Sequence, residues 1–358
     1  NGGGLIYFDR KKDTYKQYLH EPGNSNSIGN NVVVGLFLDS QKKLWIGTYK
    51  GGLDCFDGKT FIHYRHIDGD SSSLSHNNVW DIFEDTKGNL WVATLGGGLD
   101  RFDRKTKRFI HYSRITPPGT QLSYVSVLNE DKFWNLWIGT AGGIVVMNLN
   151  TGKTVNYSYS PDDPNSLSND NVNTVFQDSR GWMWIGTREG LNYFDPATKR
   201  FHSFTTKNGL PDNVILTILE DNEHRLWLGT ANGLSCLTIS AAQHYPVFSF
   251  RNYDESDGLQ GREFNDKSAL KTRGGRLIFG GANGFNLFDP SLITINHDVP
   301  PVVFTDLQIF NKSIAIGEKI KKHIILTRSV TETKSITLPY GANDFSIVFA
   351  ALGYDHTD

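Results

Sequence analysis

The chain has 358 residues, in which 36 lysines and arginines stand against 38 aspartates and glutamates, for a formal net charge of -2. This balance argues against a nucleic-acid groove, which needs a basic stripe to neutralise phosphates. No apolar run approaches the ~20 residues of a membrane-spanning helix. The 36 glycines and the 12% aromatic content, without a long helical period, favour an all-β protein.

The chain begins inside a repeat. Residues 3–9 (GGLIYFD) match residues 51–57 (GGLDCFD), but the LWIGT segment that precedes the second copy does not precede the first. The N-terminus also lacks the charged and apolar leader of a secreted protein. We therefore expect an internal fragment of a longer protein, with a truncated first repeat.

The repeat is clearest at residues 44–48 (LWIGT), an apolar segment that is followed by Gly-Gly-Leu. A weaker last copy at residues 277–281 (LIFGG) lacks the tryptophan. Spacings of 46, 46, 47 and 43 residues separate the tryptophans of the five strong copies, Trp45, Trp91, Trp137, Trp184 and Trp227. A period of this size, built from short strand-like segments, predicts a β-propeller.

One unit, residues 78–112, shows the expected blade in full. Residues 78–85 alternate apolar and polar side chains, as a half-buried strand does. A polar turn leads to the apolar residues 90–94, and glycines then lead to a third strand at 99–103 and an outer strand at 109–112. Each unit is therefore predicted to form a four-stranded sheet.

The number of blades follows from the units. Five units have four strands each, the N-terminal piece supplies two outer strands, and a last unit runs from about residue 264 to 290. This predicts a seven-bladed β-propeller with its first blade truncated. If the N-terminal strands completed the last unit instead, the ring would have six blades. We favour seven because residues 284–289 give the last unit its own third strand.

Several recurring positions have a structural interpretation. An aspartate lies six residues before the tryptophan in five repeats, which indicates a turn residue, because an active site does not need five copies. A glycine before the third strand recurs in seven repeats and indicates a positive φ or a close backbone approach. The two cysteines, Cys55 and Cys236, lie in repeats four units apart, so we expect no disulfide between them.

The repeat ends near residue 290. Alternating runs at 302–310 and 335–338 and a strand candidate at 343–352 indicate a second all-β domain, too short to close a sandwich of about seven strands. We predict a propeller over 1–292, a connector over 293–300 and the second domain over 301–358. The Pro-Pro pair at the end of the connector favours an extended, semi-rigid connection, which we hypothesise carries a ligand-induced shift between the domains.

The LWIGT, Gly-Gly-Leu and Phe-Asp segments resemble two-component regulator propeller repeats. Residues 257–265 and 275–281 resemble the terminal blade of those propellers. Residues 301–307 and 336–347 resemble the opening of the triple-tyrosine, immunoglobulin-like β-sandwich that follows them. The order of the two domains is similar to the periplasmic sensor region of hybrid two-component systems of the Bacteroidetes type, which sense glycan fragments.

This resemblance implies a periplasmic sensor that binds an oligosaccharide, catalyses nothing within this fragment and holds no cofactor or metal. It also implies partners outside this chain, namely an upstream propeller and a downstream membrane helix, histidine kinase, receiver and DNA-binding domain that control glycan-utilisation genes. We further expect a homodimer, because a change in the packing of two protomers would give the signal a route.

Propellers bind ligands on the face formed by the loops before the inner strands and the loops between the second and third strands. Positions that differ between repeats there are the candidates, since an aromatic ring can stack on a sugar and a cation can pair with an acidic group. The predicted ligand-binding residues are Tyr49, Lys50, His76, Asn77, Trp80, Arg188, Glu189, Arg262, Glu263 and Asn283. The alternative is that most of them are solvated loop residues or contacts to the missing propeller.

Two further tryptophans, Trp134 and Trp182, fall outside the repeat in turns on the opposite face. We expect them to cover blade edges or to meet a neighbouring domain.

Two other functions stay open. A propeller glycosidase or lyase would need a carboxylate pair at a set separation, and the candidates Asp81, Glu189 and Glu263 share no motif. The sequence also shows no metal-ligand spacing, nucleophile elbow or phosphate loop. A protein-interaction scaffold would bind no glycan and would show a partner-dependent surface.

Overall fold

The computed structural model describes residues 2–112, 122–241, 246–293 and 301–351. The chain divides into two compact units, Asn1–Leu292 and Ile293–Asp358. Residues 294–300, nearly all of the predicted connector, lie outside the described residues. Within the described part of the chain the helical segments are short 3-10 turns, and none is long and apolar enough to cross a membrane.

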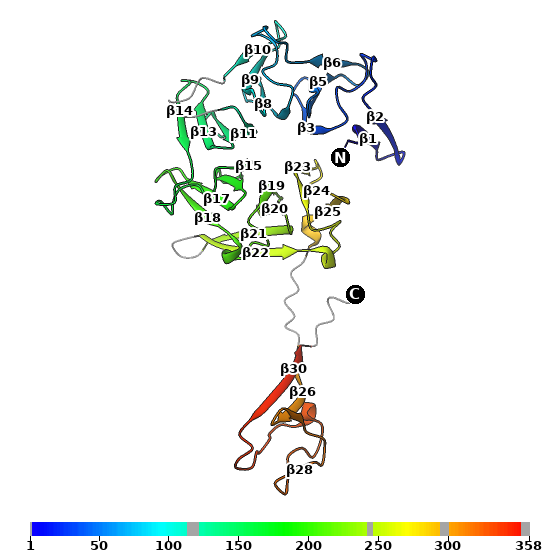
Figure 1. Ribbon diagram of the computed structural model, residues 1–358, viewed down its shortest axis with the longest axis vertical. Helices are drawn as coiled ribbons and strands as arrows, with labels where there is room; N and C mark the ends of the chain where they lie inside the picture. Colours follow the sequence, from blue (N-terminus) through cyan, green and yellow to red (C-terminus); the bar gives the residue numbers. More distant parts are fainter. Residues whose placement is uncertain (1, 113–121, 242–245, 294–300, 352–358) are drawn as a thin grey trace. The chain divides into compact units, whose positions relative to one another are not determined.

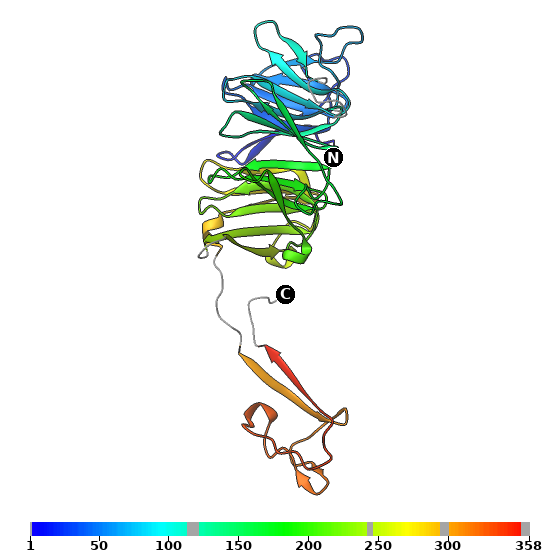
Figure 2. The same cartoon turned by 90° about the vertical axis from the view of Figure 1, so that its left-hand side faces the viewer.

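The first unit consists of antiparallel sheets that follow one another around a ring (Figure 1), and Figure 2 shows the same sheets from the side. The described residues form seven such sheets, each with its strands in chain order from the ring centre outward, which confirms the β-propeller. The first sheet contains β1 (Leu5–Asp9) and β2 (Thr14–Tyr18). The last contains β23 (Phe264–Lys271), β24 (Leu277–Gly281) and β25 (Gly284–Phe288).

Five complete blades lie between these two sheets. The first contains β3 (Val33–Leu38), β4 (Leu44–Thr48), β5 (Gly52–Phe56) and β6 (Phe61–Tyr64). The second contains β7 (Val79–Glu84), β8 (Leu90–Thr94), β9 (Gly98–Asp103) and β10 (Arg108–His111). The next contains β11 (Val125–Glu130), β12 (Asn135–Thr140), β13 (Gly143–Asn148) and β14 (Thr154–Tyr157). The fourth contains β15 (Val172–Gln177), β16 (Met183–Thr187), β17 (Gly190–Asp195) and β18 (Arg200–Phe204). The fifth contains β19 (Ile215–Glu220), β20 (Leu226–Thr230), β21 (Gly233–Ala241) and β22 (Pro246–Tyr253).

The aspartate before each tryptophan is a turn residue, as predicted, and it also binds the tryptophan. In β8 and the turn before it, one oxygen of Asp85 accepts from the backbone N–H of Asn89 at 2.8 Å, and the other accepts from Nε1 of Trp91 at 2.9 Å. The other four strong repeats make the same tryptophan bond, at 2.8–3.0 Å. The pair therefore satisfies the indole N–H inside the core.

The core lies between blades, where the tryptophan of one sheet packs against the next sheet. Trp45 of β4 is in one cluster with Val79 and Ile82 of β7 and Leu90 of β8. Its side chain is 2% exposed. Because the second strand of a complete blade lies between neighbouring sheets, it is buried over nearly its whole length, which explains the LWIGT pattern.

The glycine before each third strand has a positive φ, and in several blades it also approaches the outer strand closely; these are the two alternatives that the sequence predicted. Gly143 has a φ of 101°, and a Cβ there would collide with the carbonyl oxygen of Tyr157 in the outer strand β14. The same approach to the outer strand recurs at Gly52, Gly190 and Gly233. Only glycine fits this corner without moving the fourth strand.

The sheets β1–β2 and β23–β25 are separate, which supports seven blades rather than six. At these two ends, apolar side chains lack the neighbouring sheet that covers their counterparts elsewhere. Leu36 of β3 is 56% exposed, whereas Ile82 at the same position of β7 is 4% exposed. Phe285 of β25 is 63% exposed, whereas Leu99 of β9 is fully buried. Both cysteines are free, as expected, and both are buried.

The second unit is a small β structure with its own core around Leu307, Ile309 and Leu326. Its main sheet has the order β27 (Lys312–Ser313), β26 (Val302–Ile309) and β30 (Phe345–Ala351), and a hairpin joins β28 (Lys319–Ile320) to β29 (His323–Ile324). The predicted strand at 335–338 was wrong: these residues pair with no strand. Ile336 and Leu338 alternate with polar residues because both pack onto the core from a loop.

Candidate ligand-binding site

A β-bulge interrupts the inner strand of every complete blade and lifts one residue out of the ladder. In β7 the register shifts between Val79 and Asp81, so Trp80 is the extra residue. The equivalent shifts in β11 and β15 release Ser126 and Asn173. Bulges commonly redirect a side chain toward a site, and here the residue varies from blade to blade while the bulge itself repeats.

Three of these bulged residues, Trp80, Ser126 and Asn173, line one central cavity of about 160 Å³. The loops between second and third strands contribute Leu95, Ala141 and Arg188, and the loops before the inner strands contribute Tyr124 and Asn171. The cavity thus combines the two sets of loops that the sequence analysis assigned to the binding face.

The last blade reaches into this cavity through a larger bulge. Between Phe264 and Ala269 of β23 the register shifts by more residues than in any other described inner strand, and Asp266 lines the cavity. Lys267, which has a φ of 56°, extends its Nζ to within 2.9 Å of a carboxylate oxygen of Asp81 in β7. Asp81 also accepts a hydrogen bond from the backbone N–H of Leu128 at 2.8 Å.

Asp266 and Arg188 give the cavity its charge. Asp266 has solvent-exposed surface, but the surrounding protein excludes part of the bulk water from its carboxyl group. This desolvation raises the pKa of the carboxyl, and the positive charges of Lys267 and Arg188 partly oppose the increase. The guanidinium of Arg188 forms no hydrogen bond or ion pair with any described residue, although the Arg188 backbone N–H donates to Asn171. It is therefore available to an acidic group.

Of the ten predicted ligand-binding residues, the structure places Trp80 and Arg188 in this cavity. His76 and Asn77 instead shape the loop before β7. The Asn77 side-chain oxygen accepts from the backbone N–H of His66 at 2.8 Å, and Nδ1 of His76 accepts from Asn78 at 3.1 Å. Burial is the larger cause that lowers the pKa of His76, and the nearby His66 is the smaller one. A lowered pKa agrees with a neutral ring that accepts a hydrogen bond through Nδ1.

Both loop roles recur in other blades, so they are structural. The bond made by Asn77 is repeated by Asn31, Asp170 and Asn213. The bond made by His76 is repeated by Asn30, Asn169 and Asp212. The residue types differ between repeats, which concealed the shared role in the sequence.

The remaining predicted residues lie outside the central cavity. Nζ of Lys50 lies 5.1 Å from the ring centre of Tyr49. Glu189 accepts from Asn213 at 3.4 Å, and Arg262 pairs with Glu255 at 3.4 Å. The backbone carbonyl of Glu263 and the backbone N–H of Asn283 both bind the side chain of Gln260.

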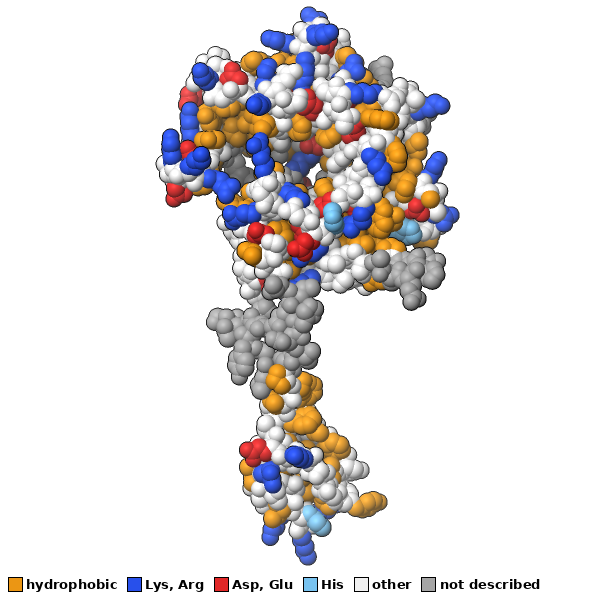
Figure 3. Space-filling model, turned by 180° about the vertical axis from the view of Figure 1, so that it is seen from behind, with side chains coloured by type: hydrophobic (Ala, Val, Ile, Leu, Met, Phe, Trp, Pro, Cys, Tyr) orange, Lys and Arg blue, Asp and Glu red, His pale blue; other side chains and the backbone are white. Residues whose placement is uncertain are grey.

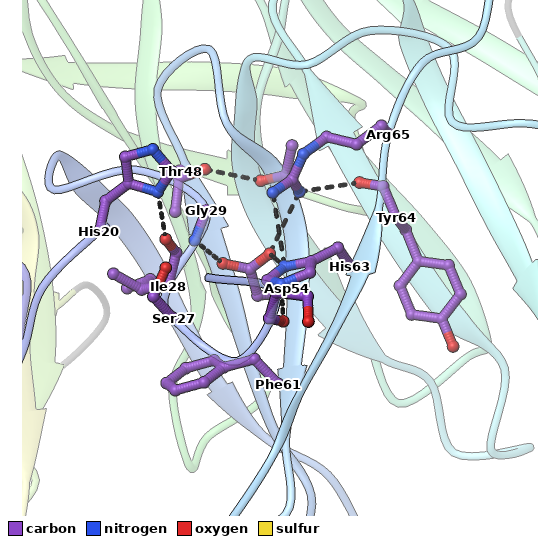
Figure 4. Close-up of polar contacts among 12 residues, drawn as sticks. His20, Ser27, Ile28, Gly29, Thr48, Asp54, Phe61, His63, Tyr64 and Arg65 are labelled. Atoms are coloured by element: carbon purple, nitrogen blue, oxygen red, sulfur yellow. Dashed lines mark hydrogen bonds and ion pairs between the residues drawn. The ribbon is translucent and has the colours of Figure 1, made fainter. Parts of the chain in front are cut away.

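In four blades a polar residue in the third strand holds the loop that leads to the inner strand. In β5, the fully buried Asp54 accepts from the backbone N–H of Gly29 at 2.6 Å, from Nδ1 of His63 at 2.7 Å and from Arg65 at 3.1 Å (Figure 4). Asp100, Asn192 and Asn286 accept the equivalent backbone N–H in three other blades. The bond from Asn192 holds the loop that carries Asn171, one of the cavity-lining residues.

Asp266 and Lys267 are not among the predicted ligand-binding residues, although the sequence contains a signal for them. Phe264 lies 14 positions before Ile278, whereas Val79 lies 12 positions before Trp91. The two additional residues lengthen the bulge of β23 and carry these side chains into the ring centre. Ser126 and Asn173 were missed because the bulge position was not recognised as the shared inward-facing position.

The carboxylates considered for glycoside cleavage are not brought together around the central cavity. The carboxylate of Asp81 forms an ion pair with Lys267 and accepts a hydrogen bond from the backbone of Leu128. Neither Glu189 nor Glu263 lines the cavity. Among the described residues, no group of three or more His, Cys, Asp or Glu side chains has a metal-binding arrangement. Lys and Arg side chains are scattered among acidic ones on the face in Figure 3 and form no single stripe there.

Comparisons with known proteins agree with the propeller fold. A model of the two component regulator propeller matches residues 27–50, 73–96, 166–189 and 209–232. A protein described as histidine kinase P4 from Formosa agariphila is 28% identical over 251 residues, which are 58% of this chain and 18% of that protein.

Solved structures of extracellular domains of hybrid two component systems from B. thetaiotaomicron are also similar. One is 26% identical with a TM-score of 0.54, over 92% of this chain and 48% of that one. Another shares the fold at 21% identity and a TM-score of 0.52, over 98% of this chain and 58% of that one. The chain thus spans about a fifth of the curated relative and about half of the first solved domain.

The sheets define a repeat β-propeller with a loop-lined cavity at its centre. More narrowly, four segments of this propeller match two-component regulator propeller repeats, and the chain is similar in fold to the extracellular domains of hybrid two-component systems.

Proposed function

We propose that this chain is the extracytoplasmic ligand-sensing region of a hybrid two-component sensor, and that it detects an oligosaccharide fragment at the central cavity. The family match and the similar extracellular domains support the sensor role. The periplasmic location, the homodimer and the coupling to a histidine kinase that regulates glycan-utilisation genes are parts of the same proposal.

One observation carries the choice of site. The uncommitted guanidinium of Arg188 lies in the same small cavity as the aromatic side chains of Trp80 and Tyr124. An aromatic ring presents an apolar face to a sugar, and a guanidinium can bind a carboxylate or sulfate through two parallel hydrogen bonds. At about 160 Å³, the cavity suits a single acidic sugar unit rather than a long chain.

Calorimetry of the complete periplasmic region against neutral and acidic oligosaccharides tests this function. An acidic fragment should bind, and Arg188→Ala and Trp80→Ala should each weaken binding about tenfold or more without a change in melting temperature. Lys50→Ala, on the same face but outside the cavity, is the matched control. Unchanged affinity in both cavity variants would place the ligand elsewhere, and a response only to a protein partner would favour a scaffold.

A further inference from the structure

A second cavity, of about 620 Å³, lies between the blade β15–β18 and the blade β19–β22 and shares no lining residue with the central cavity. We call it the rim cavity, because its walls come from the outer strands of both blades. Its aromatic lining consists of Trp182, Tyr193, Phe201, His202, Phe204 and Phe248.

One wall of the rim cavity is a row of rings that the other blades do not have. Trp184 of β16 pairs in register with Tyr193 of β17, which pairs with His202 of β18. The Tyr193 and His202 rings stack with centres 5.8 Å apart and planes 17° apart. In the blade β7–β10 the corresponding row continues from the tryptophan with Arg101 and Ile110. The aromatic row therefore extends outward to the surface in one blade.

The opposite wall comes from an unusually long hairpin. β21 and β22 have nine and eight residues, whereas the third and fourth strands of the other complete blades have four to six. The extension places Phe248 opposite Ile239, with its ring centre 4.8 Å from that of Phe204 and 6.5 Å from that of Trp182. Half-buried Trp182 thus covers the edge of a blade, as the sequence predicted, and also forms part of a cavity.

The polar groups of the rim cavity are suited to hydroxyls. The side-chain amide of Asn165 and the ring nitrogens of exposed His202 form no hydrogen bond with the described residues. The carboxylate of Asp195 binds its own turn, at 2.9 Å from the backbone N–H of Ala197 and 2.7 Å from Oγ1 of Thr198. No lysine or arginine lines the cavity, so an anionic ligand would meet Asp195 without a compensating charge.

We propose that the rim cavity binds one ring of a neutral oligosaccharide, between the Tyr193–His202 pair and Phe248. The apolar faces of a pyranose ring would lie against these rings, and its hydroxyls would bond to Asn165 and His202. The proposal concerns a second site, so it stands whether or not the central cavity binds the signal.

Fluorine NMR of the protein labelled with 5-fluorotryptophan tests this proposal. The resonance of Trp182 among the eight tryptophans is assigned with Trp182→Phe. Cellobiose, maltose and mannobiose are the neutral probes, and digalacturonate is the charged one. We expect at least one neutral probe to shift the Trp182 resonance with millimolar affinity and digalacturonate to leave it unchanged.

His202→Ala should weaken this binding about tenfold, because it removes both a stacking surface and a hydrogen-bonding group. His202 is exposed, so the variant should keep the melting temperature. Ile110→Ala removes the equivalent exposed side chain from another blade and should bind as the parent does. Arg188→Ala should also leave the rim response intact, which separates this proposal from the function of the central cavity.

Three results would overturn the proposal. One is the absence of any shift with all neutral probes. The second is a response that His202→Ala and Asn165→Ala leave unchanged. The third is a stronger response to digalacturonate, or to a proline-rich peptide, than to the neutral sugars.

Discussion

Nζ of Lys267 lies 2.9 Å from a carboxylate oxygen of Asp81, so an ion pair joins the inner strand of the last blade to the inner strand β7. The Lys267 and Asp81 side chains are only 13% and 18% exposed. The pair therefore connects blades that are far apart in the sequence, at the centre of the ring and beside the candidate site.

Removal of this pair should destabilise the propeller. Lys267→Ala leaves Asp81 largely buried with only its bond to Leu128, and we expect a loss of roughly 1–3 kcal/mol in unfolding free energy. Arg262→Ala breaks an exposed pair with Glu255 and should cost less than about 1 kcal/mol. Chemical denaturation of both variants measures the difference. Equal, small losses would show that the central pair contributes nothing.

The repeated tryptophans should dominate blade stability. Trp137 is 4% exposed and packs against the next blade, so Trp137→Ala should cost roughly 3–5 kcal/mol. Trp134 lies three residues earlier but is 50% exposed, and Trp134→Ala should cost less than about 1 kcal/mol. Thermal and denaturant unfolding check both values. A near-zero effect of Trp137→Ala would contradict the packing of the blades.

Asp100 should make stability depend on pH. Burial raises the pKa of this carboxyl from 3.8 to about 6, and its Oδ1 has no hydrogen-bond partner among the described residues. Because the folded pKa lies above the unfolded one, the folded state loses stability as the pH rises from about 4 to 6. Asn192 occupies the equivalent position of another blade, and its Nδ2 donates to Ser168 and Ile185.

Asp100→Asn should therefore stabilise the protein by up to about 3 kcal/mol at pH 7, and by much less at pH 4. Melting temperatures of the parent and the variant across this range measure the effect. Asp68→Asn changes the same charge at a fully exposed side chain and is the control. A larger gain at pH 4 than at pH 7 would reverse the assigned sign.

Asp266 should oppose an acidic ligand at the central cavity. Asp266→Asn removes the negative charge near Arg188, so an acidic sugar should bind roughly three- to tenfold more tightly. Since desolvation raises the pKa of Asp266, acidification should strengthen binding in the parent as this carboxyl protonates, and the variant should lose that part of the pH dependence. Calorimetry at several pH values tests this. Tighter binding by the parent than by the variant would mean that the carboxylate contacts the ligand.

The sequence by itself determined the propeller. The tryptophan spacing, the Asp-to-Trp turn and the third-strand glycine are local requirements of one blade, so they recur in each copy and can be recognised without a structure. The predicted ligand-binding residues also include Trp80 and Arg188, which line the central cavity, because loop positions that vary between repeats are visible in the sequence.

Only the tertiary structure decided which of the variable residues lie together in the central cavity. His76 and Asn77 look as variable as Trp80, but they bond to their own loop, whereas the bulge of β7 turns Trp80 toward the ring centre. Asp266 reaches the same cavity from a blade whose inner strand is distant in sequence. Closing a ring brings together residues with no shared local pattern, and the contacts across its centre are therefore a property of the folded disc rather than of any single repeat.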